Sequence, residues 1–316
     1  MIKININDNI KKIIETAHYK DTNKQVRAEI EKVKGEKEYK KLMNYLYDQS
    51  GNLIENKLQT LLIGNKEEII KIIDAVGKIP KKKDDPFERL YLNFTGRIWS
   101  KALLDKLNVR VCPYCNRLYT FTLENEGIRP QFDHYFPKSL FSYLSVSLYN
   151  LIPSCSICNS KKKNLNTYDK INDLYYPYDD EFSHDVVFQT SPINNDFLYW
   201  TGVSNNFDIK LISRDEKQNC KVKNIKEHLK IELLYKEHND YIREIIRKVV
   251  IYNDSRIDEL LEQFPDLFGS KDEVINSIFM SYINKESWGN RPLSKVTHDI
   301  YEEFNIFPNK LDLNKV

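Results

Sequence analysis

The sequence predicts an α+β protein in which a short β-rich segment lies between two mainly helical regions. In residues 39–47, apolar side chains recur at steps of three and one, which is typical of one face of an amphipathic helix. The pattern changes near residue 109, because residues 117–123 alternate as strands do. Helical patterns return beyond residue 222. We therefore expect three regions, namely helical residues 1–108, a middle module at 109–190 and mainly helical residues 191–316.

The first region is expected to be helical throughout most of its length. Its apolar patterns place helices near residues 30–47, 53–62, 67–76 and 87–107. The third of these should end at Gly77, since glycine is favoured just beyond a helix C-terminus and Pro80 follows it. We interpret residues 80–86 as a linker, and we expect an interruption of the last helix near residues 93–96.

The middle module is expected to open with a β-hairpin. Residues 117–123 would form one strand, residues 124–127 carry a turn signal, and residues 128–134 would return as the second strand. A short helix can begin after Ser154. Beyond the module, one strand is expected at residues 207–213, and helices are expected at residues 225–252, 255–263, 272–284 and 293–303.

The composition describes an ordinary globular protein. The chain has 316 residues, of which 41% are hydrophobic and 30% charged, so it can bury a substantial core. Its net charge of +2 supplies no general basic field, which argues against indiscriminate nucleic-acid binding. No apolar run is long enough to span a membrane, and the first residues lack the apolar core of a signal peptide. We expect a cytoplasmic protein.

Four of the five cysteines form two close pairs, Cys112-x-x-Cys115 and Cys155-x-x-Cys158. Each short turn can direct two thiolates toward one centre, and in a cytosolic chain such spacing favours zinc over disulfides. Four thiolates leave no open position for water, so this zinc ion would be structural. Cys220 stands alone and is interpreted as a free thiol.

An Asp-His pair, Asp133 and His134, lies between the two cysteine pairs. On a strand, adjacent side chains point to opposite faces, so one can bind a metal ion while the other faces an attacking water molecule. Alone, such a pair would be interpreted as a solvated Asp and a structural His. Its position between the cysteine pairs, followed by Asn150 and Asn159, favours a hydrolytic site with a second metal ion.

Three segments in this order resemble the HNH endonucleases, whose active unit is a ββα-metal finger. They are Asp133-His134-Tyr-Phe-Pro137, Asn150-Leu-Ile-Pro153 and Cys155-Ser-Ile-Cys158-Asn159, within residues 111–164. The resemblance implies that His134 is the general base, that Asp133 is the first ligand of the catalytic divalent ion, and that Asn150 braces the loop. It also implies that Asn159 completes the metal site, where its carbonyl oxygen suits Mg²⁺ or Mn²⁺.

Other segments are similar to the HNH partners of ATPase-containing bacterial anti-phage systems of the Septu type. They are Tyr176-Pro-Tyr-Asp179, Leu234-Tyr-x-x-His238 and Arg291-Pro-Leu-Ser-Lys295. This resemblance implies an antiviral nuclease that works in a complex with an ATPase, and it makes the C-terminal region the expected site of partner binding.

Basic residues near the motif are candidates for contacts with a phosphate backbone. Lys161, Lys162 and Lys163 follow the last cysteine, where a helix start also attracts anions. Lys162 is preferred because it lies one helical turn beyond Asn159. Arg117 and Lys138 are further candidates.

We expect a zinc-stabilised HNH endonuclease that cleaves DNA. One alternative keeps the chemistry but takes RNA, tRNA included, as the substrate, because a metal finger grips a phosphate and reads little of the sugar. The other alternative is a zinc-ribbon binding module for nucleic acid or protein, in which the Asp-His pair has no catalytic role.

Overall fold

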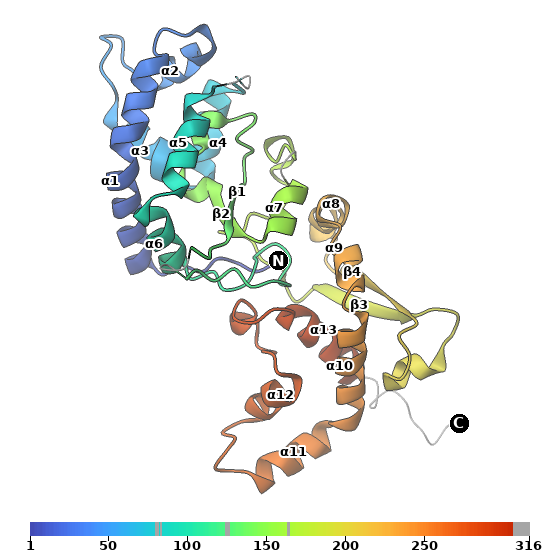
Figure 1. The fold of residues 1–316 in the computed structure, drawn as a ribbon. Coiled ribbons are helices and arrows are strands. Elements are labelled where there is room, and N and C mark those ends of the chain that lie inside the picture. The colour runs from blue at the N-terminus through green and yellow to red at the C-terminus, as the bar shows by residue number, and fades with distance from the viewer. Residues whose placement is uncertain (80–81, 83, 124–126, 163–164, 306–316) are drawn as a thin grey trace.

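A computed structural model describes residues 1–79, 82, 84–123, 127–162 and 165–305. It confirms the α+β class, because helices are combined with two small antiparallel sheets of two strands each. One part of the molecule contains helices α1 to α7 with strands β1 and β2, and the other contains β3, β4 and helices α8 to α13 (Figure 1). Among the described residues, none of the helices combines the length and the apolar character that crossing a membrane requires.

Before the middle module, the described residues form six α-helices. They are α1 (Asp8–Val33), α2 (Lys40–Leu46), α3 (Glu55–Ile63), α4 (Lys66–Val76), α5 (Pro86–Thr95) and α6 (Ile98–Leu107). α4 begins with a capping box between Asn65 and Glu68, and it ends at Gly77, whose φ of +78° suits glycine. α5 begins at Pro86, with Asp85 as its N-cap. The expected helix ends at Gly77 and near residues 93–96 are thus present in the structure.

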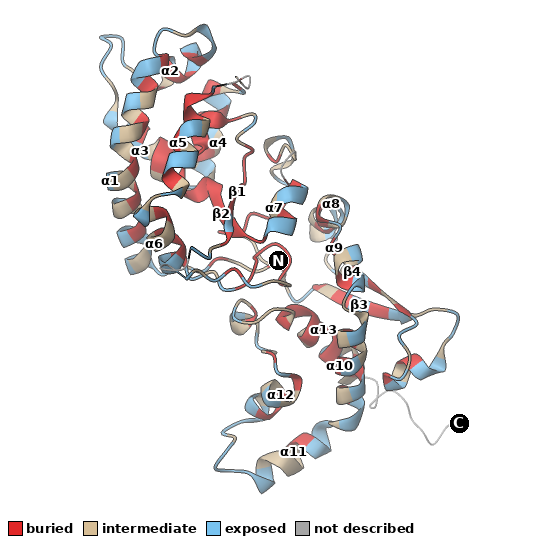
Figure 2. Ribbon diagram, viewed as in Figure 1, coloured by how far each residue is buried: buried red, intermediate tan, exposed pale blue. Residues whose placement is uncertain are grey.

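The middle module contains β1 (Gln131–His134), β2 (Leu151–Ser154) and α7 (Ser156–Lys162). The expected hairpin of residues 117–134 is wrong, because β1 pairs with β2, with Asp133 opposite Ile152. Residues 117–123 form only isolated bridges, and their alternating side chains Tyr119, Phe121 and Leu123 are exposed. The alternation of residues 117–123 therefore did not mark a strand with one buried face. The strands that do form, β1 and β2, are almost entirely buried (Figure 2).

The C-terminal part is built on β3 (Val186–Pro192) and β4 (Phe207–Ser213), which pair antiparallel. Its helices are α8 (Asn219–Leu229), α9 (Ile231–Lys236), α10 (Asn239–Ile251), α11 (Asp254–Gln263), α12 (Lys271–Phe279) and α13 (Ser294–Asn305). The single helix expected at 225–252 is broken, because Lys230 has a left-handed backbone with φ +53°. The strand β3 was not expected from the sequence. The expected boundary between the middle module and the C-terminal region, at residue 190, falls inside β3.

The loop that carries the first cysteine pair joins the two parts of the molecule. Asn116 is 2% exposed, and its side-chain Nδ2 donates to the carbonyl of Trp288 (2.8 Å) while its Oδ1 accepts from the backbone N–H of Lys295 (3.0 Å). The hydroxyl of Tyr235 donates to the carbonyl of Cys115 (2.7 Å). The C-terminal helices are therefore hydrogen-bonded directly to the backbone and side chains of this loop.

His18, in the middle of α1, ties two helices to the loop that precedes β2. Trp99 of α6 donates its Nε1–H to His18 Nδ1 (3.2 Å), so this nitrogen carries no proton. The other ring nitrogen, Nε2, donates to the carbonyl of Val146 (2.7 Å). Burial lowers the pKa of His18 to about 4, so the ring is neutral at pH 7.

We expect His18 to make the protein less stable as the pH falls from 7 to 5. The unfolded imidazole, with a pKa of about 6.5, takes up a proton over this range, whereas the folded ring, with a pKa of about 4, does not. Its stabilising contribution is complete above pH 6.5 and is lost as the pH falls toward 4. Between pH 7 and pH 5, the free energy of unfolding measured with urea should fall by about 2 kcal/mol less in His18→Gln than in the wild-type chain. Equal losses in the two proteins would contradict this account.

Candidate functional site

The four paired cysteines come together in one buried cluster. The Sγ atoms of Cys112, Cys115, Cys155 and Cys158 all lie within 4.8 Å of one another, and those of Cys115 and Cys155 are 3.9 Å apart. Tetrahedral zinc with bonds of about 2.3 Å places its sulfur ligands roughly 3.8 Å apart. The cluster therefore fits a structural metal ion such as zinc.

Backbone groups around the cluster also suit sulfur ligands that carry negative charge. The N–H of Cys155 donates to the sulfur of Cys112 (3.4 Å), and the N–H of Cys158 donates to that of Cys155 (3.5 Å). Burial raises the pKa of the Cys112 thiol, because it disfavours the thiolate. A bound cation would reverse this effect and hold the cysteines as thiolates.

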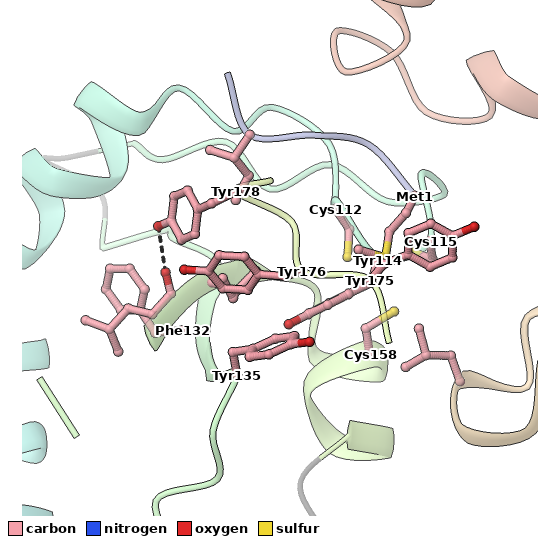
Figure 3. Close-up of a cluster of buried hydrophobic side chains, with 14 of the residues drawn as sticks. Met1, Cys112, Tyr114, Cys115, Phe132, Tyr135, Cys158, Tyr175, Tyr176 and Tyr178 are labelled. Carbon is pink, nitrogen blue, oxygen red and sulfur yellow. Dashed lines mark hydrogen bonds between the residues drawn. The ribbon is translucent and has the colours of Figure 1, made fainter. Parts of the chain in front are cut away.

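Tyrosines surround the cluster and the adjoining strands (Figure 3). Tyr176 donates its hydroxyl proton to the carbonyl of Tyr149 (2.6 Å), and Tyr178 donates to the carbonyl of Leu151 at the start of β2 (2.8 Å). The Tyr135 and Tyr176 rings meet edge to face, with centroids 4.8 Å apart. These rings pack β1 and β2 against residues 175–178, so the position of the strands is closely defined.

Asp133 of β1 is buried and has two partners. Its Oδ2 accepts a hydrogen bond from the hydroxyl of Tyr114 (2.6 Å) and lies 2.9 Å from Lys162 Nζ. Lys162 also donates to the carbonyls of His134 (3.3 Å) and Tyr135 (3.1 Å). Burial lowers the pKa of Lys162, and the negative charge of Asp133 opposes this effect.

The position of Lys162 corrects the expectation that this residue contacts a phosphate. Its side chain is only 5% exposed, and its ammonium group lies inside the protein. The physical reason is the burial of Asp133, since an ionised carboxylate in the interior requires a cation close to it. Asp133 also lines a cavity that it shares with His134.

His134 is held by a backbone carbonyl of the loop that follows β1. Its Nε2 lies 2.8 Å from the carbonyl oxygen of Ser145, which can only accept, so Nε2 carries the proton. Burial lowers the pKa of His134 to about 4, and the imidazole is therefore neutral at pH 7, with Nδ1 as a proton acceptor. The ring of Tyr91 in α5 packs edge-on against it, with centroids 4.5 Å apart.

Asn150 is fully buried and braces the same loop. Its Oδ1 accepts from the N–H of Phe136 (2.7 Å), and its Nδ2 donates to the carbonyls of Phe136 (3.1 Å) and Leu144 (3.0 Å). Because Leu144 precedes Ser145, these bonds fix the carbonyl that orients His134.

Asp133, His134 and Asn159 line one cavity of about 620 Å³. Asn159, in α7, donates its Nδ2 to Gln131 Oε1 (2.7 Å), which leaves its carbonyl Oδ1 as an acceptor. Carboxylate and amide oxygens of this kind are the hard ligands that Mg²⁺ and Mn²⁺ prefer. The residues present therefore fit a divalent ion.

The remaining basic candidates lie in different surroundings. Lys138 lines the cavity and forms an ion pair with Glu88 (3.2 Å), and Lys161 is exposed on α7. Arg117 lies elsewhere, because its Nε donates to His238 (3.0 Å) in the C-terminal part. Lys163 lies outside the described residues.

Sequence reasoning missed the wall of the cavity that α5 supplies. Asp85, Glu88 and Tyr91 all line the cavity. Residues 80–86 were interpreted as a linker before a helix at 87–107, and nothing local indicated that this helix lies beside His134.

Comparison of the chain with protein-family models, with curated protein sequences and with solved structures found no match.

We expect the purified chain to contain one tightly bound zinc ion per molecule. Cys155→Ser should lose most of this zinc, and its free energy of unfolding should fall by several kcal/mol, because three thiolates bind the ion less well and metal binding is coupled to folding. Cys220→Ser is the matched control, since Cys220 is exposed and outside the cluster. Metal analysis by mass spectrometry together with chemical unfolding measures both effects. A metal-free wild-type chain of unchanged stability would contradict the assignment.

We expect Lys162→Met to be strongly destabilising. The substitution leaves the buried Asp133 without its cation, which typically costs about 3–5 kcal/mol. Lys161→Met, at the neighbouring exposed position, should change the free energy of unfolding by less than about 0.5 kcal/mol. Urea unfolding of both variants gives the comparison. Equal effects would show that Lys162 is a surface residue.

Proposed function

We propose that this protein is a metal-dependent endonuclease of the HNH kind, with zinc in the four-cysteine cluster. The observation that carries the proposal is the single cavity lined by Asp133, His134 and Asn159. These residues come from β1 and α7, and the order of two paired strands followed by a helix is that of a ββα-metal finger. The motif order in the sequence and this arrangement in space support the same function.

His134 would act as the general base. Its Nδ1 is unprotonated at pH 7 and can take a proton from a water molecule placed in the cavity for attack on phosphorus. The carbonyl of Ser145 holds the opposite ring nitrogen, and it can stabilise the imidazolium that forms. Asn150 contributes by restricting the geometry of this loop rather than by chemistry.

Asp133 and Asn159 would hold Mg²⁺ or Mn²⁺. When bound, the ion supplies Lewis-acid stabilisation of the charge that develops on the phosphate and on the leaving oxygen. Tyr114 and Lys162 both contact Oδ2 of Asp133 and so restrict the orientation of this carboxylate, which lines the cavity, and Oδ1 would bind the ion. Asn159 is oriented in a similar way by its bond to Gln131.

DNA is the proposed substrate, and a protein partner is part of the proposal. Lys138, which lines the cavity, and the exposed Lys161 of α7 would contact phosphates. Large apolar side chains are exposed in the C-terminal helices and their connections, as is common at protein-binding surfaces. They include Val250, Ile251, Phe264, Leu267 and Met280. An ATPase is the partner that the sequence resemblance favours.

We expect the chain, alone or with its native partner, to nick plasmid DNA in the presence of Mg²⁺. His134→Ala should lower the cleavage rate by about 10² to 10⁴, because the general base is lost. His228→Ala is the control, since His228 lies outside the cavity, where Lys170 donates to it (3.1 Å). Both variants should keep their zinc. Equal cleavage by His134→Ala and the wild-type chain would refute the proposal.

The same assay with labelled duplex DNA, single-stranded RNA and tRNA identifies the substrate. If only RNA is cleaved, and His134→Ala abolishes this cleavage, the assignment of the catalytic site stands and the substrate is RNA rather than DNA. Binding of nucleic acid without cleavage, even with the native partner present, would favour a zinc-ribbon binding module.

A further inference from the structure

Two carboxylate–lysine pairs include residues that line the cavity of His134, and the two pairs differ in burial. Asp133 and Lys162 are 2.9 Å apart, and their side chains are only 3% and 5% exposed. Glu88 of α5 and Lys138 are 3.2 Å apart, but their side chains are 33% and 31% exposed. Separating the first pair would leave unpaired charges in the interior, whereas water can solvate both members of the second pair when they separate.

Lys138 is the only lysine or arginine among the described residues that line this cavity. Carboxylates line it at three positions, Asp85, Glu88 and Asp133. A phosphodiester is an anion, and a cavity with this balance of charges repels it unless a cation is available. Apart from a bound metal ion, Lys138 is therefore the cation that the lining can offer to a substrate phosphate, and it is already paired with Glu88.

One face of α5 holds Lys138 beside the proposed base. Glu88 and Tyr91 are three residues apart in this helix, so their side chains are neighbours on its surface. The Nζ atom of Lys138 lies 4.8 Å from the centre of the Tyr91 ring, in a cation–π contact. The same ring packs against the imidazole of His134, with centroids 4.5 Å apart. The ammonium group and the proposed base thus lie against one ring.

A phosphate oxygen can take the place of the Glu88 carboxylate next to Lys138. Both groups are anions that accept a charge-assisted hydrogen bond from an ammonium group, so the exchange replaces one such bond by another. The carboxylate that is released is partly exposed, and water can solvate it. The exchange therefore requires only that a solvent-exposed ion pair opens, and such pairs are weak.

A structural role is the alternative explanation of the pair. Lys138 belongs to the loop between β1 and β2 and Glu88 to α5, so the ion pair would only hold this loop against the helix. The loop has another bond to α5, because the hydroxyl of Ser145 donates to the carbonyl of Phe87 (2.8 Å). In a structural role, loss of the Glu88 charge loosens the loop and does not favour binding of nucleic acid. In a competing role, the same loss strengthens binding.

We propose that Glu88 is a specificity-determining residue of the nuclease site, because it competes with a substrate phosphate for Lys138. The inference rests on the proposed function, since it concerns the nucleic-acid substrate assigned there to this cavity. A phosphate gains Lys138 only by displacing Glu88, so nucleic acid that makes few other contacts is bound weakly. Glu88 thereby favours substrates that other contacts of the protein also hold.

Binding of a fluorescently labelled DNA duplex to the zinc-loaded full chain, measured by anisotropy without added Mg²⁺ or Mn²⁺, tests the inference. Glu88→Gln keeps the size of the side chain and removes its charge, and it should lower the Kd by about fivefold. Lys138→Met should raise the Kd, and adding Glu88→Gln to Lys138→Met should change it no further. Urea unfolding checks that each variant is folded.

Glu67→Gln is the matched control for the loss of one negative charge. Glu67 is an exposed carboxylate in the first turn of α4, as Glu88 is a carboxylate in the first turn of α5, and it lies outside the cavity. Because salt screens charges that do not contact the ligand, this control should bind DNA within about 1.5-fold of the wild type.

The two backgrounds separate the outcomes. If Glu88→Gln tightens binding equally in the wild-type and Lys138→Met chains, Glu88 acts only through its charge and the inference is overturned. If Glu88→Gln weakens binding or leaves it unchanged, the pair is structural and the inference is also overturned, whereas the proposed function stands on its own cleavage assay. If the expected pattern appears but no nucleic acid is cleaved, the competition for Lys138 stands and the nuclease proposal fails. Absence of DNA binding by both the wild type and Glu88→Gln overturns the inference.

Discussion

The gathering of four sulfur atoms is the constraint on which the rest of the middle module depends. Cys115 and Cys155 are 40 residues apart in the chain, and the segment between them contains β1 and the loop that holds His134. Cys155 directly precedes α7, and Cys158 lies within it. A metal ion bound here would hold α7 beside β1, which is the arrangement that brings Asn159 into the same cavity as His134.

The sulfur cluster and the cavity are connected through one tyrosine. Tyr114 lies between the first two cysteines, and its hydroxyl donates to Asp133. The turn that supplies two sulfurs therefore also supplies a hydrogen bond to the carboxylate that would bind the divalent ion. Lys162 completes this connection from α7. Three polar groups buried together are favourable only when each has its partners, which explains why this network joins three separate segments.

The paired spacing of the cysteines was sufficient to predict their cluster, because the three-residue step within each pair is local. Asp133 and Asn159 are 26 residues apart, and only the resemblance to the HNH endonucleases suggested that they belong to one site. The pairing of β1 could not be predicted, since its partner β2 follows a loop of 16 residues, 135–150, with no hairpin signal. Residues 117–123 alternate without one buried face, so their alternation predicted the wrong strand pairing.

The contributions of distant segments were also beyond the sequence patterns. The role of Lys162 follows from the burial of Asp133, which only the folded structure defines. Asp85 approaches the cavity from a helix 48 residues before Asp133 in the chain, and no spacing rule covers such a distance. Long-range packing, rather than local propensity, determines these positions.

The attachment of Asn116 to the C-terminal helices limits how this chain can be divided. A fragment that stopped near residue 190 would leave the amide of Asn116, now bonded to Trp288 and Lys295, without either partner, and it would cut β3 from β4. The carbonyl of Cys115 would likewise lose the hydroxyl of Tyr235. The loop that carries Cys112 and Cys115 is thus hydrogen-bonded to both parts of the molecule, and neither part keeps all of its partners when the chain is divided near residue 190.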